Sequence, residues 1–240
     1  MTVNPPSGLL VLDKPSGPTS FDCVHRVKRF FPGARVGHCG TLDPMAEGVL
    51  LILLGPSTRL QDQFLALEKQ YWFRAKWGVK THTGDREGNV LETRAVTPLS
   101  KERVEEITPQ FMGETLQTPP RVSALKYKGK RMYKWTREGI EVPRAPRPVT
   151  ISTLTILSSQ DDVWEGRVVC SRGTYIRTLA EDIAERLGTL AHLDALVRER
   201  VGPYTREQGL SWDRLQTLTS EQLLSLTLDP NPVKIYAAVH

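Results

Sequence analysis

The sequence predicts a mixed α/β protein of the α+β type rather than a doubly wound fold. Seven or eight strand patterns and four or five helix patterns occur along the 240 residues, without the strict alternation of βαβ units. Hydrophobic residues make up 39% of the chain and no apolar run reaches 18 residues, which is typical of a soluble globular protein without a membrane span. A chain of this length forms one large domain or two small ones.

The first predicted elements enclose a loop rich in glycine and proline. An apolar run over residues 8–14 predicts a short buried strand. Ser20 is a candidate cap for a helix over 21–31, whose apolar face holds Phe21, Val24, Val27 and Phe31. The unbroken apolar run over 48–54 predicts a strand buried on both faces. The loop over 37–48 therefore lies between a helix and a buried strand.

The middle of the chain predicts a helix over 55–67, then a long strand over 69–79 that is rich in aromatic residues. A polar turn at 84–88 leads to a further strand over 89–93. Ser100 opens a helix that extends to about residue 112.

The C-terminal part predicts two neighbouring strands over 149–157 and 163–171. A helix follows over 175–187 and ends at Gly188. Residues 193–201 fit a strand or a helix equally well, and a last short helix covers 221–226.

The positive charge of the protein is concentrated in one segment. The whole chain carries +5, whereas residues 121–150 hold nine Lys or Arg against Glu138 and Glu141, a net charge of +7. Prolines at both ends of this segment indicate an insertion that leaves the core and returns. Its basic side chains alternate with aromatic rings at Tyr127, Tyr133 and Trp135, and this combination suits looped or single-stranded RNA. The alternative is a surface hairpin that only aids solubility.

One carboxylate, Asp43, lies in the middle of the glycine-rich loop and directly before Pro44. On residue types alone, an ordinary Asp-Pro turn is the favoured interpretation. The alternative is a rigidly held nucleophile beside a sheet.

Three further side chains are candidates to act with Asp43. Arg177, at a predicted turn into a helix, has the chemistry to pair with a carboxylate and keep it ionised. Tyr71 offers a ring for stacking and a phenol for proton transfer, and Tyr175 offers a second ring. Taken singly, a surface arginine and two core aromatics are the simpler interpretations.

Other classes of site lack support in the sequence. Cys23, Cys39 and Cys170 form neither a CxxC pair nor a disulfide framework, which favours a reducing cytoplasm. The five histidines show no metal-binding spacing, so we expect no metal. The N-terminus has no secretory-signal pattern.

Taken together, five ordered motifs resemble the bacterial TruB-type tRNA pseudouridine synthases. The loop over 37–50 resembles the catalytic loop of that family, and the similarity extends from about Gly8 to about Gly202. The four other stretches are Leu12-Asp13-Lys14-Pro15, Lys69-Gln70-Tyr71, Ser123-Ala124-Leu125-Lys126-Tyr127 and Arg172-Gly173-Thr174-Tyr175-Ile176-Arg177.

The resemblance implies a pseudouridine-synthase fold, with a mixed, largely antiparallel sheet flanked by helices. It implies isomerisation of uridine 55 in the T-loop of tRNA, with neither cofactor nor metal. It assigns Asp43 as the nucleophile, Arg177 as its partner and Tyr71 as the ring that stacks on the target base and a candidate for proton transfer. It places His38 in the gap left by the flipped base.

The resemblance also assigns the remaining site residues. Tyr175 and Leu196 line the uracil pocket. The segment 121–150 becomes a flexible arm that closes over the RNA, and its RNA-binding residues are Lys126, Lys128, Lys130, Arg131 and Lys134.

The expected organisation is a catalytic domain over 1–210, carrying this arm, and a short extension over 211–240. Family members commonly end in a PUA domain, and about thirty residues are too few for a complete one. We expect a monomer that acts on the T-arm of tRNA without a membrane or an obligatory protein partner. The alternatives are the same chemistry on a different RNA, and a non-catalytic RNA-binding or tRNA-folding protein.

Overall fold

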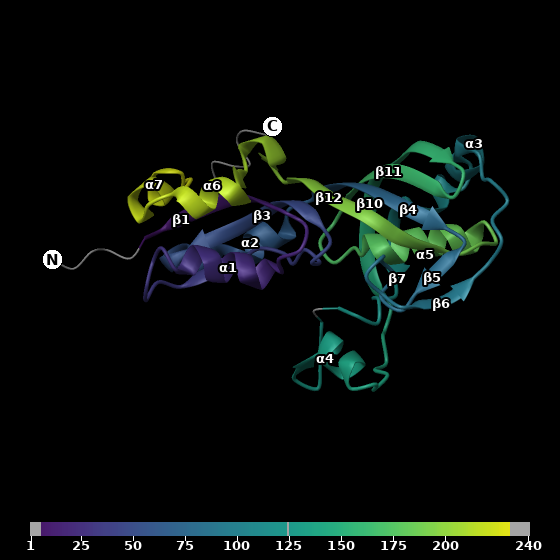
Figure 1. The fold of residues 1–240 in the computed structure, drawn as a ribbon, viewed down its shortest axis with the longest axis horizontal. Helices are drawn as coiled ribbons and strands as arrows, with labels where there is room; N and C mark the ends of the chain where they lie inside the picture. The colour runs from purple at the N-terminus through teal and green to yellow at the C-terminus, as the bar shows by residue number, and fades with distance from the viewer. Residues whose placement is uncertain (1–5, 124, 231–240) are drawn as a thin grey trace. The chain divides into compact units, whose positions relative to one another are not determined.

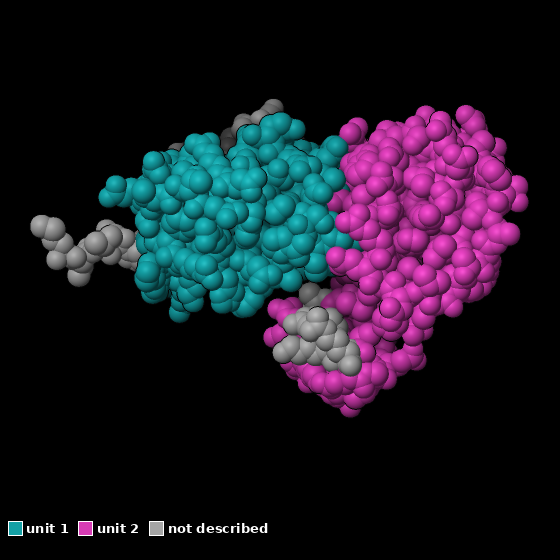
Figure 2. Space-filling view, in the orientation of Figure 1, with its two compact units in different colours: residues 1–70, 197–240 teal, residues 71–196 magenta. Residues whose placement is uncertain are grey.

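The computed structural model describes residues 6–123 and 125–230 and divides the chain into two compact units (Figure 2). Unit 1 comprises residues 1–70 and 197–240, and unit 2 comprises residues 71–196. Strands β4 (Lys69–Trp77) and β12 (Ala191–Val201) contribute residues to both ranges. The division into a catalytic domain over 1–210 and an extension over 211–240 stays a prediction.

Unit 1 is built on a sheet with the strand order β14-β1-β3-β12 (Figure 1). The predicted first strand is confirmed as β1 and pairs antiparallel with β3, so that Leu10 lies opposite Ile52. β14 runs parallel to β1, and the C-terminal part of β12 runs parallel to β3. Short strands β2 and β13 pair antiparallel with β3 and β12. The bounds are β1 Gly8–Lys14, β2 Val36–His38, β3 Glu47–Leu54, β13 Tyr204–Thr205 and β14 Leu210–Ser211.

The strand β3 is the centre of the unit 1 core, as its unbroken apolar sequence predicts. Residues 48–54 are all buried, so both faces of the strand are covered. On one face, a hydrophobic cluster joins β1 and β3 to α2 and the end of β12, with members Leu9, Val11, Cys39, Val49, Leu51, Leu53, Phe64, Val201 and Tyr204.

The first helix, α1 (Ser20–Lys28), begins one residue earlier than predicted and has a different cap. Thr19 is the N-cap and forms a capping box with Asp22, which satisfies two backbone donors at the helix start. The prediction that Ser20 caps this helix is therefore wrong. Phe21 is 64% exposed and does not belong to the buried stripe, which holds Cys23, Val24 and Val27.

The predicted helix over 55–67 forms as a 3₁₀ helix followed by one short α-helix, with Pro56 in the first turn, where its missing N–H costs no helical hydrogen bond. Towards the C-terminus of the unit, the predicted helix over 221–226 is confirmed, and the helix directly before it was not predicted. Leu215 and Leu223 of these two helices are fully buried. The helices of unit 1 after α1 are η1 Gly55–Leu60, α2 Gln61–Ala66, η3 Arg206–Gln208, α6 Trp212–Thr217 and α7 Ser220–Ser225.

Unit 2 contains the strand order β12-β4-β11-β10-β7. The segment over 193–201, which fits two structures by sequence, is part of strand β12. The rings of Trp77 and Trp164 stack at 4.7 Å in the core, and Phe73 meets Trp164 edge-on at 5.1 Å. The remaining strands are β5 Val79–Thr81, β6 Val90–Thr93, β7 Gly113–Gln117, β10 Arg147–Gln160 and β11 Val163–Cys170.

Two helical regions of unit 2 were predicted. Ser100 caps the first as expected, but the helix ends at Glu105 and a 3₁₀ turn replaces its second half. The second is α5, which ends before Gly188, whose φ is +78°. The bounds are α3 Lys101–Glu105, η2 Thr108–Phe111 and α5 Ile176–Arg186.

The basic segment leaves the sheet after β7 and returns at the start of β10 (Figure 1). It contains a small hairpin of β8 (Lys126–Tyr127) and β9 (Lys130–Arg131), followed by α4 (Met132–Arg137). In the structure the predicted arm over 121–150 corresponds to residues 119–146, because β10 already begins at Arg147. From here on, the arm means residues 119–146. Across residues 6–123 and 125–230, no helix is long and apolar enough to cross a membrane.

Candidate active site

The loop that carries Asp43 is held by a buried lysine. Lys14, at the end of β1, has no exposed surface. Its ammonium group donates to three backbone carbonyls, at 2.9 Å to Pro15, 3.0 Å to Pro44 and 2.6 Å to Ala46. Two of these carbonyls belong to Pro44 and Ala46, which closely follow Asp43 in the chain. Because a buried ammonium is costly unless its donors are used, these bonds fix the lysine and the loop to each other.

Two more buried polar side chains hold the same loop. Ser20 accepts from the backbone nitrogen of Leu42 at 2.8 Å and donates to its carbonyl at 3.0 Å. Arg198, on β12, is 1% exposed and donates to the carbonyls of Val49 at 2.7 Å and Gly40 at 3.1 Å. The backbone on both sides of Asp43 therefore has its polar groups satisfied by side chains from three different elements.

Glycine is required where the loop enters β3. Gly48 has a φ of +100°, and a Cβ atom there would lie 2.2 Å from the carbonyl oxygen of Arg198. This close approach allows the parallel pairing of β3 with β12, in which Gly48 lies opposite Arg198.

Within this frame, Asp43 is half-buried. Its backbone carbonyl accepts from the nitrogen of Ala46 at 3.1 Å, which closes a tight turn. His38, at the end of β2, is also half-buried, and its carbonyl accepts from the side-chain amide of Gln61 at 2.8 Å. Both residues therefore lie on backbone that is fixed by hydrogen bonds.

Lys14 also creates a local electric field at the loop. Burial lowers the pKa of Lys14 to about 8, and attraction to Cys23 and Asp43 partly opposes that shift. At neutral pH the lysine is charged, and a positive charge near a carboxylate favours the ionised carboxylate.

The pKa of Lys14 predicts how stability depends on pH. Between about pH 8 and 10.5 the native state has lost this proton while the unfolded chain retains it. The free energy of unfolding should therefore rise with pH in this window, by at most ~3 kcal/mol. Below pH 8 the contribution of Lys14 should be constant and the protein less stable. Urea unfolding at several pH values measures this, with Lys14→Met as the comparison. Parallel profiles for the two proteins would contradict the prediction.

In unit 2, Arg177 lies in the first turn of α5 and is 4% exposed. It donates to the carbonyls of Thr83 at 2.6 Å and Val122 at 3.0 Å, and its guanidinium lies 3.7 Å from the carboxylate of Asp85. Asp85 is itself 4% exposed and accepts from the Thr83 hydroxyl at 2.6 Å and the Glu87 nitrogen at 3.1 Å. Arg177 is thus firmly oriented, while its pairing with Asp43 of unit 1 stays a prediction.

The other predicted site residues of unit 2 belong to α5 and two adjacent strands. Tyr71 on β4 is 9% exposed and Leu196 on β12 is 7% exposed. Tyr175 is the N-cap of α5, and its backbone exchanges two hydrogen bonds with the side chain of Gln117, at 2.8 and 3.1 Å. Gln117 is 5% exposed at the end of β7 and therefore fixes the start of the helix that carries Arg177.

The predicted RNA-binding lysines of the arm differ in their surroundings. Lys126 and Lys128 are exposed and have no carboxylate partner among the described residues. Lys130 pairs with Glu138, and its ammonium lies 4.3 Å from the centre of the Trp135 ring. Arg131 is exposed, and the side chain of Lys134 lies outside the described residues. Lys126 and Lys128 are therefore the better phosphate ligands of this set.

Sequence reasoning missed Asp85, Gln117 and Arg198 and gave no role to Lys14. Lys14 directly follows an apolar strand pattern, which is a weak signal, and Arg198 lies among other charged residues, which gives no signal. Asp85 lies in a segment that resembles any polar turn, and Gln117 lies in a strand that was not predicted.

Comparison with known proteins agrees with these motifs. The family model described as TruB family pseudouridylate synthase (N terminal domain) matches residues 28–176, and that of the tRNA pseudouridylate synthase B C-terminal domain matches residues 177–231. The tRNA pseudouridine synthase B of Hydrogenovibrio crunogenus is 39% identical over 97% of this chain and 76% of its own length. The Burkholderia mallei protein of the same name is 44% identical over 90% of this chain and 71% of its own length.

Solved structures give the same fold. A chain of a Cbf5-Nop10-Gar1 complex matches with a TM-score of 0.67 and 26% identity, over 93% of this chain and 60% of the matched chain. A chain of an H/ACA RNP bound to a substrate RNA matches with a TM-score of 0.62 and 26% identity. This chain spans about half of that second chain. The sequence motifs, the fold and both family models agree: the chain belongs to the TruB family of pseudouridylate synthases.

Proposed function

We propose that this chain isomerises uridine 55 in the T-loop of tRNA to pseudouridine, with Asp43 as the nucleophile. The observation that carries the proposal is the setting of Asp43, on a loop whose flanking backbone is held by the buried side chains of Lys14, Ser20 and Arg198. Such support suits a carboxylate that must meet a sugar carbon in one geometry. The tRNA pseudouridine synthase B relatives make tRNA the favoured substrate.

The chemistry balances without a second reactant. The bond between C1′ and N1 of the uridine breaks and a bond between C1′ and C5 forms. The proton on C5 leaves, and N1 gains one. Asp43 acts by attack at C1′ or C6, or by assisting departure of the base through a glycal. Tyr71 or Asp43 accepts the C5 proton. Because each atom of the product is already present in the substrate apart from exchanged protons, this reaction consumes no second substrate and involves no net oxidation or reduction, and we propose that it proceeds without a cofactor.

The target base is stacked inside the T-loop, so it must be extruded before reaction, at a cost of a few kcal/mol. In the proposed complex His38 fills the space that the base leaves, while Tyr71, Tyr175 and Leu196 surround the uracil. Arg177 pairs with Asp43 and keeps it ionised. The arm supplies phosphate contacts through Lys126 and Lys128 and excludes water from the detached base. We propose that the enzyme is a monomer and needs no protein partner.

The proposal is tested by tritium release from a tRNA transcript labelled at C5 of its uridines. We expect this chain alone, without added cofactor, to release about one tritium per tRNA, because one uridine is isomerised. A transcript with cytidine at position 55 should release none. Equal release from that transcript would assign the activity to another uridine. Tight tRNA binding without release would favour the RNA-binding or RNA-folding alternative.

A further inference from the structure

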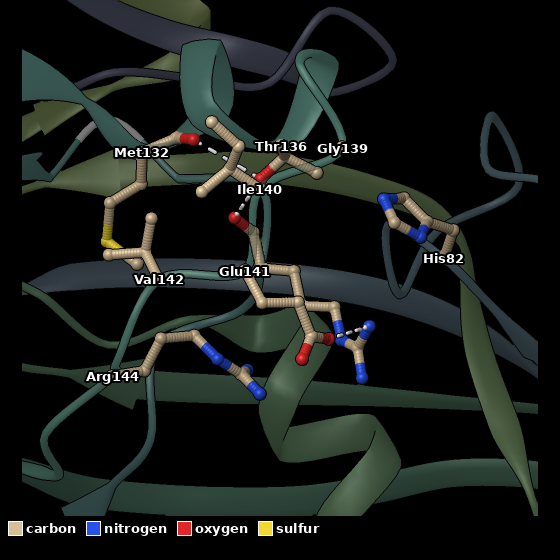
Figure 3. Close-up of a pocket in the computed structure, with 9 residues that line it drawn as sticks. His82, Met132, Thr136, Gly139, Ile140, Glu141, Val142 and Arg144 are labelled. Atoms are coloured by element: carbon tan, nitrogen blue, oxygen red, sulfur yellow. Dashed lines mark hydrogen bonds and ion pairs between the residues drawn. The ribbon is translucent and has the colours of Figure 1, made fainter.

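A pocket lies at the base of the arm, where the chain leaves unit 2 and returns to it (Figure 3). We refer to it as the arm-base pocket. Its polar lining comes from three separate segments of the chain: the turn after β5, the outgoing side of the arm and the returning side. The residues that matter here are His82, Arg121, Met132, Ile140, Glu141 and Arg144.

Two guanidinium groups in this pocket have little competition from carboxylates. Arg121 donates to Glu141 at 2.7 Å, but both side chains are largely exposed, at 46% and 80%. An ion pair so exposed contributes only about 0–1 kcal/mol. Arg144 donates to the carbonyl of Pro119 at 2.9 Å and has no ion pair among the described residues. Most of its N–H donors are therefore open to a ligand.

The backbone of the pocket is held in place before any ligand arrives. The hydroxyl of Thr136 donates to the carbonyl of Arg121 at 3.0 Å, which ties the outgoing chain to α4. The bond from Arg144 to Pro119 ties the returning chain to the outgoing one. The carbonyl of Val122 accepts from Arg177 at 3.0 Å. The arm-base pocket is therefore fixed relative to a residue of the proposed active site within the same unit.

The chemistry of this pocket fits a phosphate. Guanidinium groups bind phosphate oxygens through parallel hydrogen bonds. The half-buried ring of His82 adds a further polar group from the opposite side (Figure 3). The surrounding segment carries a net +7, which favours an anion that is part of a polyanion. The half-buried Glu181 lines a neighbouring pocket with Arg121 and Arg144, and Lys80 in the same lining provides a positive charge that opposes the charge of this carboxylate.

We propose that the arm-base pocket binds a phosphodiester of the substrate RNA, with Arg121 and Arg144 as its ligands and Glu141 as the group that holds Arg121 until the RNA arrives. The inference rests on the proposed function for the identity of the polyanion. It adds a binding site away from the arm's exposed Lys126 and Lys128. It also predicts that Glu141 opposes RNA binding although it belongs to a basic RNA-binding segment.

The test compares two substitutions that should change the affinity for tRNA in opposite directions. Binding of a tRNA transcript is measured across a series of salt concentrations, with Asp43→Asn in every protein so that no product forms. Arg144→Gln should weaken binding about tenfold and reduce the slope of log affinity against log salt by about 1, since one phosphate contact is lost. Glu141→Gln should strengthen binding about threefold, because Arg121 no longer has to exchange one anion for another.

A matched control exists on α3 of the same unit. Arg103 of α3 and Glu106 at its C-terminal cap form an ion pair at 2.6 Å that is also largely exposed and lies outside the arm. If general surface charge alone acted, Arg103→Gln and Glu106→Gln would change binding as much as the arm variants do. We expect no change from either. Weaker binding on Glu141→Gln, or an unchanged salt slope on Arg144→Gln, would overturn the proposal.

The two proposals fail in different ways. If the unsubstituted chain releases tritium from tRNA but the arm-base variants bind as their parent does, the phosphate site is wrong and the proposed function stands. If Arg144→Gln and Glu141→Gln change tRNA binding with the predicted signs but the unsubstituted chain releases no tritium, the phosphate site stands and the proposed function is wrong. A parent that does not bind tRNA overturns both.

Discussion

Asp43→Asn should lower the rate of pseudouridine formation by several orders of magnitude while leaving tRNA binding nearly unchanged. Asparagine has almost the same shape as aspartate but is neither negatively charged nor nucleophilic. The hydrogen bonds that hold the loop use the carbonyls of Gly40, Leu42, Pro44 and Ala46, and these do not involve the carboxylate. The substitution therefore removes the proposed chemistry and keeps the frame.

The measurement is tritium release under single-turnover conditions, with tRNA binding measured on the same preparations. Asp62→Asn is the control, because Asp62 lies in α2 of the same unit and is exposed. It changes the net charge equally and should leave the rate unchanged. Equal rates for the parent and Asp43→Asn would remove Asp43 from its role. Lost binding as well as lost rate would indicate that the carboxylate supports the loop instead.

The fold was predictable where apolar residues are continuous. β1 and β3 were predicted nearly to the residue because five consecutive positions of β1 and seven of β3 are buried. Weak periodicity explains the errors. Strand β7 alternates poorly and was missed, and Leu116 within it is 70% exposed. The α6 helix is only six residues long, too short for a clear helical periodicity.

The sequence predicted the residues with obvious chemical roles. It did not predict the residues that fix their positions through hydrogen bonds. Asp43 and Arg177 belong to motifs whose order along the chain resembles a known family. Arg198 was given no role, because it lies in a segment with four charged residues among nine that fits a strand or a helix equally well. Its role depends on carbonyls about 150 residues earlier in the chain, at Gly40 and Val49. No local pattern carries that information.

Ser20 shows the same limit at shorter range. A serine before an amphipathic stretch predicts an N-cap, yet Thr19 fills that position because its side chain and that of Asp22 form a capping box. The Ser20 hydroxyl is instead directed to both polar groups of the Leu42 backbone. The spacing of Thr19 and Asp22 is a local signal for the cap that was overlooked, whereas the contact of Ser20 with Leu42 is tertiary and has no local signal.

Gly48→Ala should be among the most destabilising single substitutions in unit 1. The new Cβ would lie 2.2 Å from the carbonyl oxygen of Arg198 and 2.9 Å from its carbonyl carbon. Neither strand can easily retreat, because β3 is fully buried and Arg198 also donates to the carbonyl of Val49. The φ of +100° adds strain for any residue with a side chain. We expect a loss of about 3–5 kcal/mol in the free energy of unfolding.

Gly17→Ala separates the two contributions. Gly17 has a similar φ of +108°, but a Cβ there meets nothing within 4 Å. Its substitution should cost only the backbone strain, about 1–2 kcal/mol. Urea unfolding of both variants measures the difference, which is the steric cost of placing a Cβ atom at Gly48 against the carbonyl of Arg198. Because Asp43 lies on the loop that this contact anchors, Gly48→Ala should also lower the rate of tritium release at temperatures where the variant remains folded, and Gly17→Ala should lower it much less. Equal unfolding free energies for the two variants would mean that the close approach at Gly48 relaxes at little cost and does not fix the loop.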